Sequence, residues 1–438
     1  MEALFTKNGT PAFMSSKKIF AVTKLPEAKT EEPKSSFYFG EREFVSWGDN
    51  NKRPDEMVRV IGSTGVLSTA VGFKTRTSFG QGVLPMKADG FSESGNPKFV
   101  PYNDPWLTEY FDGYTFRNYI TQAFRDLFKF GNCFPIFYFN EDGQIATVIN
   151  RNARHCRVSR DKNYLCVYPD FWKSDPDEKT AEVIEMLNED DPFLDFERRK
   201  AAGKLKGRPL AFPRIKNYYS NNDYYGVPDW DAAWKSGWVD IAHKIPAFLA
   251  QSYANAMSLM WHIQVPASFW EKKFPEEQFE NPTKRQDAIN EFMDSMESSL
   301  CGEENVSKAL FTDYEASLSG KELDGWKITR LENEIDAKER LSTSAAANSE
   351  ILFSMMINPS VFGAGMPGGS YAGNSGSGSD IRESFLVSVI TTYIEKQQVL
   401  DPVMLFMRDR GYKDLKLKYK ETILTTLNTG QAKEDILS

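Results

Sequence analysis

The chain has 438 residues, of which 41% are hydrophobic and 26% charged, so it has enough apolar material for a packed core and is not globally disordered. Its 53 Lys and Arg against 61 Asp and Glu give a net charge of -8. Tight nucleic-acid binding rests on neutralising phosphates, so this balance argues against a protein that grips nucleic acid over a broad basic face. It does not exclude one that lets nucleic acid pass.

The sequence carries no signal for a membrane or for export. It has no apolar run of about 18 residues, which argues against a membrane span. The N-terminus lacks the apolar segment of a secretory signal. Four cysteines show no disulfide-framework or CxxC spacing, which fits a reducing compartment. We therefore expect a soluble protein made in the cytosol.

The first half of the chain predicts a mixture of helices and strands. Residues 1–46 are rich in Lys, Glu and Ser and indicate an arm rather than a core element. From Trp47 a polar turn and Pro54 mark a helical start. Large apolar side chains at helical spacing predict a helix over Trp106–Phe130.

Gly131 is expected to end that helix, because glycine readily adopts the left-handed conformation of a helix C-terminus. Two aromatic or β-branched runs around Asn140–Gly143 predict a β-hairpin. The fold class is therefore α+β. Residues 172–208 are densely charged and indicate a surface excursion.

The second half predicts three long helices. Trp230, Trp234 and Trp238 open an apolar three- and four-residue pattern that predicts a helix over residues 229–262, with a kink at Pro246. The segment from Ile263 to Arg330 predicts a strand over IQVPASFW, a helix around residues 285–300, and two strands ending in GWKITRL.

The second long helix is predicted over Glu334–Ile357, and its small residues favour close helix packing. Between Gly363 and Ser379 the chain has seven glycines and four serines in seventeen residues. A third long helix is expected from Asp380, with Glu383 placed for a capping box, and DLKLKYK predicts a closing strand.

Motifs for catalysis and cofactor binding are missing from the sequence. There is no GxSxG, GxxxxGK[ST] or HExxH pattern. Gly363–Gly368 matches GxGxxG, but no strand precedes it and no helix follows directly, as dinucleotide binding requires. His155 with Cys133, Cys156 and Cys166 offers metal ligands, although buried structural thiols are the favoured interpretation. We predict no catalytic residue, no metal and no cofactor.

One basic stretch has two interpretations. Lys and Arg side chains recur between residues 200 and 216, directly before Tyr218 and Tyr219. They would suit contact with phosphate or with an acidic partner, whereas a solvated loop is the favoured interpretation.

Three segments together carry a resemblance to a known family. They are FKFGNCFPIFYFNEDGQI, then DYYGVPDWDAAW leading into a long helix, and, after a small α/β insertion, ILFSMMINPSVFGAGMPGGSYAGNSGSGSDIRESFLVSVITTYIEKQQVLDPVM. In this order and spacing they resemble the portal proteins of tailed bacteriophages, over roughly residues 47–425. Portal proteins form a dodecameric ring at one capsid vertex, through which double-stranded DNA is packaged and ejected.

The resemblance implies a division of the chain into the parts of a portal subunit. In chain order they are an N-terminal arm (1–46), the first part of the wing (47–228), stem helix 1 (229–262), the clip (263–332), stem helix 2 (333–358), the tunnel loop (359–379), the wing helix with the closing strand (380–420), and a short crown or tail (421–438). Many relatives build a larger crown, so a prominent one is not expected here.

The resemblance also implies partners and site residues. The expected partners are eleven further copies, DNA in the tunnel, terminase, a head-tail adaptor and the major capsid protein, with no membrane; the expected location is the virion. Expected DNA-proximal residues are Val361, Phe362, Met366, Tyr371 and Asn374. The expected clip docking surface comprises Lys308, Lys321 and Lys327, and Trp230, Trp234 and Trp238 are expected to pack in the stem.

Two other functions remain open from the sequence. One is a head-to-tail adaptor ring, although 438 residues is long for such a protein. The other is a nucleotide-dependent enzyme that uses the Gly-rich segment. Large rings with a central hole and a narrow stem are expected only from a portal protein.

Overall fold

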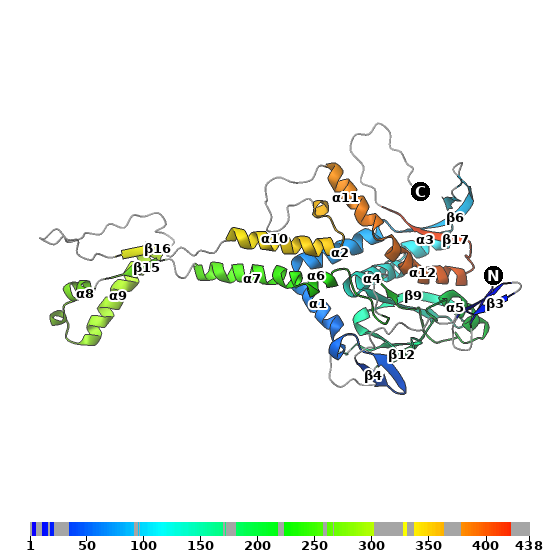
Figure 1. Cartoon of the computed structure of the whole chain (residues 1–438), viewed down its shortest axis with the longest axis horizontal. Helices are drawn as coiled ribbons and strands as arrows, with labels where there is room; N and C mark the ends of the chain where they lie inside the picture. Colours follow the sequence, from blue (N-terminus) through cyan, green and yellow to red (C-terminus); the bar gives the residue numbers. More distant parts are fainter. Residues whose placement is uncertain are drawn as a thin grey trace. The chain divides into compact units, whose positions relative to one another are not determined.

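The computed structural model describes residues 2–5, 11–15, 18–21, 35–91, 95, 97–169, 171, 181–217, 223–256, 261–265, 267–301, 327–330, 337–362 and 378–421. The chain forms two compact units. The larger unit comprises residues 1–243 and 341–438, and the smaller one comprises residues 244–340. The mixture of helices and sheets agrees with the predicted α+β class (Figure 1).

Helices and strands alternate along the larger unit. Its helices are α1 (Arg53–Ser63), α2 (Gly65–Phe79), α3 (Pro105–Asp112), α4 (Tyr114–Phe130), α5 (Pro192–Ala201), α6 (Asp231–Lys235), the start of α7 (Trp238–Ala256), most of α10 (Ala337–Ser354), α11 (Gly378–Ile390) and α12 (Tyr393–Asp409), with short 3-10 turns η1 (Asp49–Asn51), η2 (Ala153–His155) and η6 (Pro359–Phe362).

Strands of the larger unit fall into several sheets. They are β1 (Glu2–Phe5), β2 (Pro11–Ser15), β3 (Lys18–Ala21), β4 (Ser36–Phe39), β5 (Arg42–Val45), β6 (Val83–Phe91), β7 (Pro97–Pro101), β8 (Asn132–Phe139), β9 (Ile145–Arg151), β10 (Cys156–Val158), β11 (Tyr164–Val167), β12 (Glu182–Met186), β13 (Leu210–Ala211), β14 (Ile215–Lys216) and β17 (Leu415–Tyr419).

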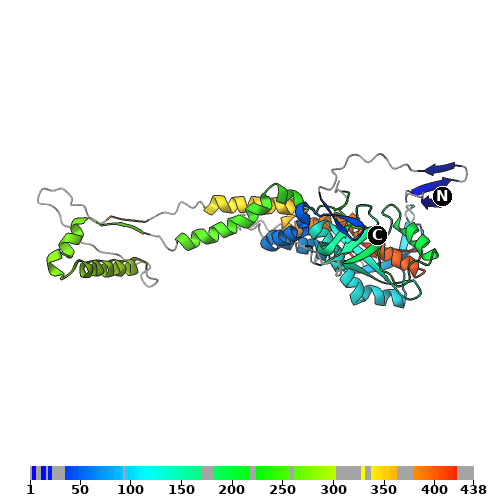
Figure 2. The same cartoon turned by 90° about the horizontal axis from the view of Figure 1, so that it is seen from below.

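The main sheet runs in the order β10-β11-β12-β13-β8-β14, and β9 pairs with β8. Every pair in it is antiparallel except β12 with β13. The predicted hairpin is confirmed: β8 and β9 pair with Phe137 opposite Val148. Helices α4 and α12 both contact β9, and α4 also contacts β8, so a helical layer covers these strands (Figures 1 and 2).

A second sheet joins distant parts of the chain. Strand β6 lies between β7 and the C-terminal strand β17, and all pairs are antiparallel. Leu415 of β17 is opposite Lys87 of β6. The predicted closing strand is confirmed, and it pairs with a segment more than three hundred residues earlier.

Helix α4 shows how local sequence sets an element. Its buried face carries Phe116, Ile120, Phe124 and Leu127 at helical spacing. It ends at Gly131, whose φ of 70° and ψ of 10° are left-handed and whose N–H donates to Leu127 O at 2.8 Å. The predicted stop is confirmed.

The single helix predicted over Trp106–Phe130 is wrong, because it divides at Gly113 into α3 and α4. At the start of α3, the side chain of Asp104 accepts from the backbone N–H groups of Trp106 and Leu107. Gly113 is extended, with φ -71° and ψ 154°, so the helical hydrogen-bond ladder restarts there.

The predicted arm is too long, since its last part belongs to the folded unit. Strands β4 and β5 form an antiparallel pair, and Phe44 is fully buried among Tyr168 and Phe171. The alternation of aromatic and polar residues over SFYF and REFV accounts for this placement.

The surface excursion predicted over residues 172–208 is also wrong in part. Strand β12 lies inside the main sheet with Ile184 and Met186 buried, and α5 buries Phe196. The charged residues of this segment occupy the outward positions of these short elements. Residues 172–180 lie outside the described residues.

Two of the predicted long helices are interrupted. The helix predicted over residues 229–262 breaks at Ser236–Gly237, where Gly237 has φ of 89°, and α7 ends at Ala256. Pro246 lies inside α7. The helix predicted from Asp380 breaks at Thr391–Thr392, where the two hydroxyls donate to the carbonyls of Ser388 and Val389. Such side-chain bonds to the preceding turn offer the backbone an alternative to the helix.

The smaller unit is made of helices and one strand pair. Strands β15 (Trp261–Gln264) and β16 (Lys327–Arg330) pair antiparallel, and the helices are α8 (Ala267–Lys273) and α9 (Pro282–Cys301), with a short turn η4 (Glu276–Gln278). The strand predicted over IQVPASFW is therefore partly wrong, because its last residues start α8. The helix predicted around residues 285–300 is confirmed as α9.

Within the described residues, no helix is both long enough and apolar enough to cross a membrane. Helices α7 and α10 both contain the boundary between the two units. Their ends in the larger unit, residues 238–243 and 341–354, belong to its core through Val239 and Ile351. The candidate site lies directly before the first of these ends, in the segment that leads into α7.

Candidate functional site

The segment that precedes α7 crosses the C-terminus of α4 and is held there by specific contacts. We call residues 225–235 the anchor segment. Tyr225 begins it: its ring stacks on Trp47 with centroids 4.5 Å apart. Its hydroxyl donates to Val45 O at 2.7 Å and accepts from the N–H of Val158. Burial raises the pKa of Tyr225 to about 12, so the hydroxyl keeps its proton and donates.

Two glycines let the anchor segment approach the end of α4. The N–H of Gly226 donates to Asn132 Oδ1 at 2.7 Å, and Asn132 Nδ2 donates to Gly226 O at 2.9 Å. A Cβ on Gly226 would lie 2.4 Å from Gly131 O, and one on Gly131 would lie 2.5 Å from the carbonyl carbon of Val227. No side chain fits at either position.

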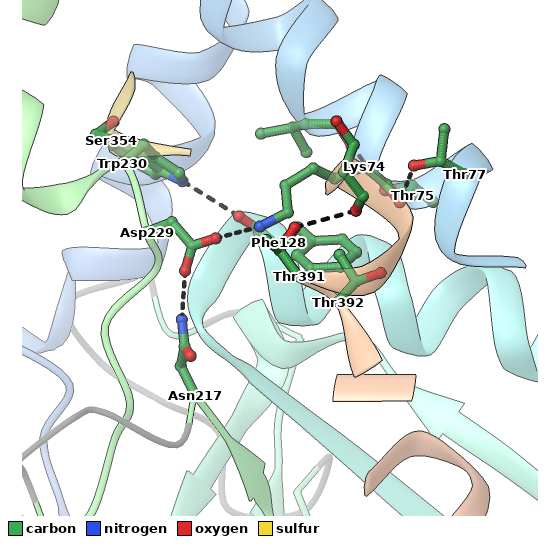
Figure 3. Close-up of polar contacts among 12 residues, drawn as sticks. Lys74, Thr75, Thr77, Phe128, Asn217, Asp229, Trp230, Ser354, Thr391 and Thr392 are labelled. Carbon is green, nitrogen blue, oxygen red and sulfur yellow. Dashed lines mark hydrogen bonds and ion pairs between the residues drawn. The ribbon is translucent and has the colours of Figure 1, made fainter. Parts of the chain in front are cut away.

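A buried ion pair fixes the middle of the anchor segment (Figure 3). Lys74 Nζ of α2 lies 2.5 Å from Asp229 Oδ2, and both side chains are buried. Asn217 Nδ2 donates to the other carboxylate oxygen at 2.7 Å, and the Lys74 ammonium lies 4.9 Å from the ring centroid of Phe128. The partners of both charges are thus supplied within the fold, as burial requires.

A second carboxylate lies near this pair. Glu395 of α12 is buried, and its Oε2 has no hydrogen-bond partner. Burial raises the pKa of Glu395; the positive charge of Lys74 opposes this rise, and the negative charge of Asp229 adds to it.

Tryptophans tie the end of the anchor segment to α1 and α4. Trp230 is fully buried, and its Nε1 donates to Phe128 O at 3.3 Å. Its ring stacks on Trp234 with centroids 5.5 Å apart. The Arg53 guanidinium lies over the Trp234 ring, with its carbon 3.9 Å from the ring centroid. The same guanidinium donates to Asp231 Oδ1 at 2.5 Å. Trp238 is half-buried against the same core.

The arrangement is suited to holding helices in place rather than to bond chemistry. Each polar group of the anchor segment named above has a partner inside the larger unit, and the segment leads directly into α7. Sequence reasoning identified its tryptophans but missed Lys74, Asn132 and Asn217. A lysine among apolar residues of a helix was the available signal for Lys74.

Reactive side chains in the described part of the chain are scarce. It contains no group of three His, Cys, Asp or Glu side chains placed to hold a metal ion. Cys133, Cys156 and Cys166 are buried free thiols. Burial raises the pKa of all three, to about 12 for Cys166, so they stay protonated and poorly nucleophilic.

A depression of about 440 Å³ adjoins α5 and α12. Arg214, Gln398 and Asp401 are among the residues that line it. Burial raises the pKa of Asp401 to about 6. Charged residues make up half of the lining, unlike the mainly apolar wall of a small-molecule pocket.

Most of the sequence-predicted tunnel and clip residues lie outside the described residues. These are Met366, Tyr371, Asn374, Lys308 and Lys321. Val361 and Phe362 belong to η6, which packs against α11, and Lys327 begins β16.

Comparisons with known proteins show similarity in fold but not in sequence family. No protein-family model and no curated protein sequence matches the chain. Among solved structures, a chain in the neck of an empty GTA particle computed with C6 symmetry is 14% identical, with a TM-score of 0.55, and the match covers 86% of this chain and 85% of that chain.

Two further matches come from the native particle. A chain in the neck computed with C12 symmetry is 12% identical with a TM-score of 0.56, and the match covers 87% of this chain and 86% of that one. A chain in the virion of the native gene transfer agent is 13% identical with a TM-score of 0.54, covering 89% and 86%. This chain therefore shares its α+β fold with chains in the neck and virion of gene transfer agent particles.

Proposed function

We propose that this chain is a structural subunit of a homo-oligomeric portal ring at the head-tail junction of a phage-like particle. The observation that carries the proposal is the fold likeness to neck components over more than 85% of this chain, one of them in a neck computed with C12 symmetry. The element order adds support: residues 263–332 lie between α7 and α10, as a clip is inserted between two stem helices.

The anchor segment has a clear role in such a ring. We assign α7 and α10 to the stem, residues 263–332 to the clip, and residues 359–379 to the tunnel loop. A stem must keep its direction while DNA moves past it. The Lys74–Asp229 ion pair and the stacked rings of Trp230 and Trp234 lie directly before α7 and hold the start of this helix in place.

The charge of the chain suits a conduit for double-stranded DNA. A net charge of -8 per subunit, multiplied around a ring, gives weak overall attraction for a polyanion. We propose that Val361, Phe362, Met366, Tyr371 and Asn374 contact DNA sterically during packaging and ejection, since the loop that holds them has no basic side chain.

The remaining partners follow from the position of such a ring. We propose that Lys308, Lys321 and Lys327 belong to a clip surface that docks terminase and later the head-tail adaptor, and that the wing contacts the major capsid protein. The protein would be made in the host cytoplasm and incorporated into the virion. It would need no cofactor and catalyse no reaction.

Electron microscopy of the purified full-length chain in negative stain tests the proposal. The expected result is rings with a central hole and a narrow stem. Particles without a central hole at concentrations of several micromolar would contradict it. ATP hydrolysis by the purified chain, abolished by a substitution in the Gly-rich segment, would favour the enzyme alternative.

A further inference from the structure

Helix α11 has its charged residues, Asp380, Arg382 and Glu383, near its start, and its last six residues are apolar apart from the buried Ser388. Its inner side packs against α2 and η6 and buries Ser384, Ser388 and Val389. The Ser388 hydroxyl donates to Ser384 O at 2.9 Å, so this side needs no outside partner. Its outer side carries Leu386, Val387 and Ile390.

The outer side continues into the first turn of α12. We call Leu386, Val387, Ile390, Tyr393 and Ile394 the outer stripe. Their exposed fractions are 43%, 56%, 68%, 64% and 44%. Large apolar side chains that are exposed together in one patch are typical of interaction sites. Among the described residues, α2 and η6 cover the inner side of α11, and the outer stripe is largely exposed.

The length of α11 excludes a membrane-spanning role. The helix has 13 residues, and at about 1.5 Å per residue it is much shorter than the roughly 30 Å core of a bilayer.

Charge favours a second copy of the chain as the occupant. Each copy carries -8, so copies repel one another and associate best where few charges meet. The outer stripe has no charged member, and the neighbouring Glu395 and Lys396 are buried; the exposed Glu383, one turn before Leu386 and Val387, lies at its edge. An aromatic, aliphatic and uncharged composition is typical of the centre of a protein interface.

The exposed area of the outer stripe indicates how large a contact it could form. The outer stripe exposes several hundred square ångströms, which is at the upper end for a monomeric protein. A stable interface takes about 800 Å² from each partner, so the outer stripe is the centre of a larger contact.

We propose that the outer stripe is the centre of the contact between neighbouring copies of this chain. The inference rests on the proposed ring, because a closed ring uses a heterologous interface in which the stripe meets a different face of the next copy. Burial of the stripe then supplies most of the apolar contribution to each subunit contact.

The first test compares Ile390→Lys with Tyr38→Lys by mass photometry of the full chain. Both positions are about equally exposed, at 68% and 65%, and Tyr38 lies on β4, away from the stripe. Ile390→Lys is expected to raise the concentration for half-assembly at least tenfold, and Tyr38→Lys to leave it unchanged. Lysine is a good helix former, so thermal melting of the unassembled chain should not change.

The second test identifies the occupant directly. Ile390 is replaced by the photocrosslinker p-benzoylphenylalanine, and the chain is irradiated at assembling concentration. A product of twice the chain mass is expected. A product of single-chain mass, including one joined to residues 422–438 of the same chain, overturns the proposal, as does normal assembly of Ile390→Lys.

The two tests separate this inference from the proposed function. If the wild type forms particles without a central hole and the crosslink still doubles the mass, the portal function fails and the interface stands. If rings form and the crosslink stays within one chain, the function stands and the interface is refuted.

Discussion

The two units differ in how deeply they bury their side chains. The larger unit has fully buried Trp230, Phe124 and Phe137 in one continuous core. In the smaller unit, no side chain that the structure describes is fully buried. Its main contacts join aromatic rings 5.3–6.3 Å apart, namely Phe269, Trp270, Phe274, Phe279 and Phe292.

This difference shows where stability comes from in each unit. Because hydrophobic stabilisation scales with buried apolar area, the larger unit has the material to fold alone. The described part of the smaller unit buries little apolar area. We therefore expect this unit to be the less stable part of an isolated chain and to gain stability on assembly.

The largest loss of stability is expected when a fully buried side chain is removed from the core of the larger unit. Trp230→Ala should destabilise it by about 3–5 kcal/mol, because a fully buried indole leaves a cavity and Phe128 O loses its donor. Denaturant unfolding followed by circular dichroism measures this loss. Trp234→Ala is the control and should cost less, since Trp234 is only half-buried. Equal losses would show that Trp230 is not the centre of this core.

The next effect concerns the buried ion pair. Lys74→Met should destabilise the larger unit by about 3 kcal/mol, because Asp229 is left buried without its cation. Adding Asp229→Asn should restore part of the loss, with a coupling of about 1–3 kcal/mol in a double-mutant cycle. The control is Lys235→Met, which removes an exposed partner of Asp231 and should cost under about 1 kcal/mol. Additive losses at Lys74 and Asp229 would contradict the pairing.

A smaller effect, confined to the other unit, is expected from Trp270→Ala. Loss of this half-buried ring should cost about 1–2 kcal/mol. Hydrogen exchange should accelerate at the amides of α9 and stay unchanged at those of α4. Faster exchange in both helices would mean that the two units unfold as one cooperative block.

The smallest effect is a pH dependence within the larger unit. Burial raises the pKa of Asp401 from 3.8 to about 6, so the folded chain binds the proton more tightly than the unfolded chain. Its contribution to stability is present below about pH 4 and is lost as the pH rises to 6. Asp401→Asn should therefore be more stable at pH 7.5, by roughly 1 kcal/mol after allowance for partial exposure.

Thermal melting at pH 4, 5, 6 and 7.5 measures this difference. The gain of Asp401→Asn over the wild type should grow through this range and level off above pH 6. A gain that is the same at all four values would contradict the raised pKa.

Local signals made part of the fold predictable. Gly131 ended α4 and the Asn140–Gly143 turn formed its hairpin, because both depend on residues close in sequence. The breaks at Gly113, Gly237 and Thr391 were not predicted. At these points the apolar spacing continues, while backbone conformation and hydroxyl hydrogen bonds interrupt the helix.

The candidate site was predictable only in part. Trp230 was identified because bulky aromatic residues at helical spacing indicate a packed face. Its polar neighbours were not, since Lys74 and Asp229 are 155 positions apart and no spacing in one sequence connects them. Whether Trp230, Trp234 and Trp238 also take part in contacts between subunits stays a prediction.

The pairing of β17 with β6 has a consequence for the order of events during synthesis. Val83 and Tyr419 are partners at one end of this strand pair. The ribosome must therefore make the whole smaller unit and α12 before the sheet of the larger unit gains its last strand. Until then the β6 edge and the apolar residues that face β17 stay uncovered in the nascent chain. Pairing across so much sequence is slow, and such exposed edges favour aggregation. Folding yield in cells should therefore depend on chaperones until translation has passed Tyr419.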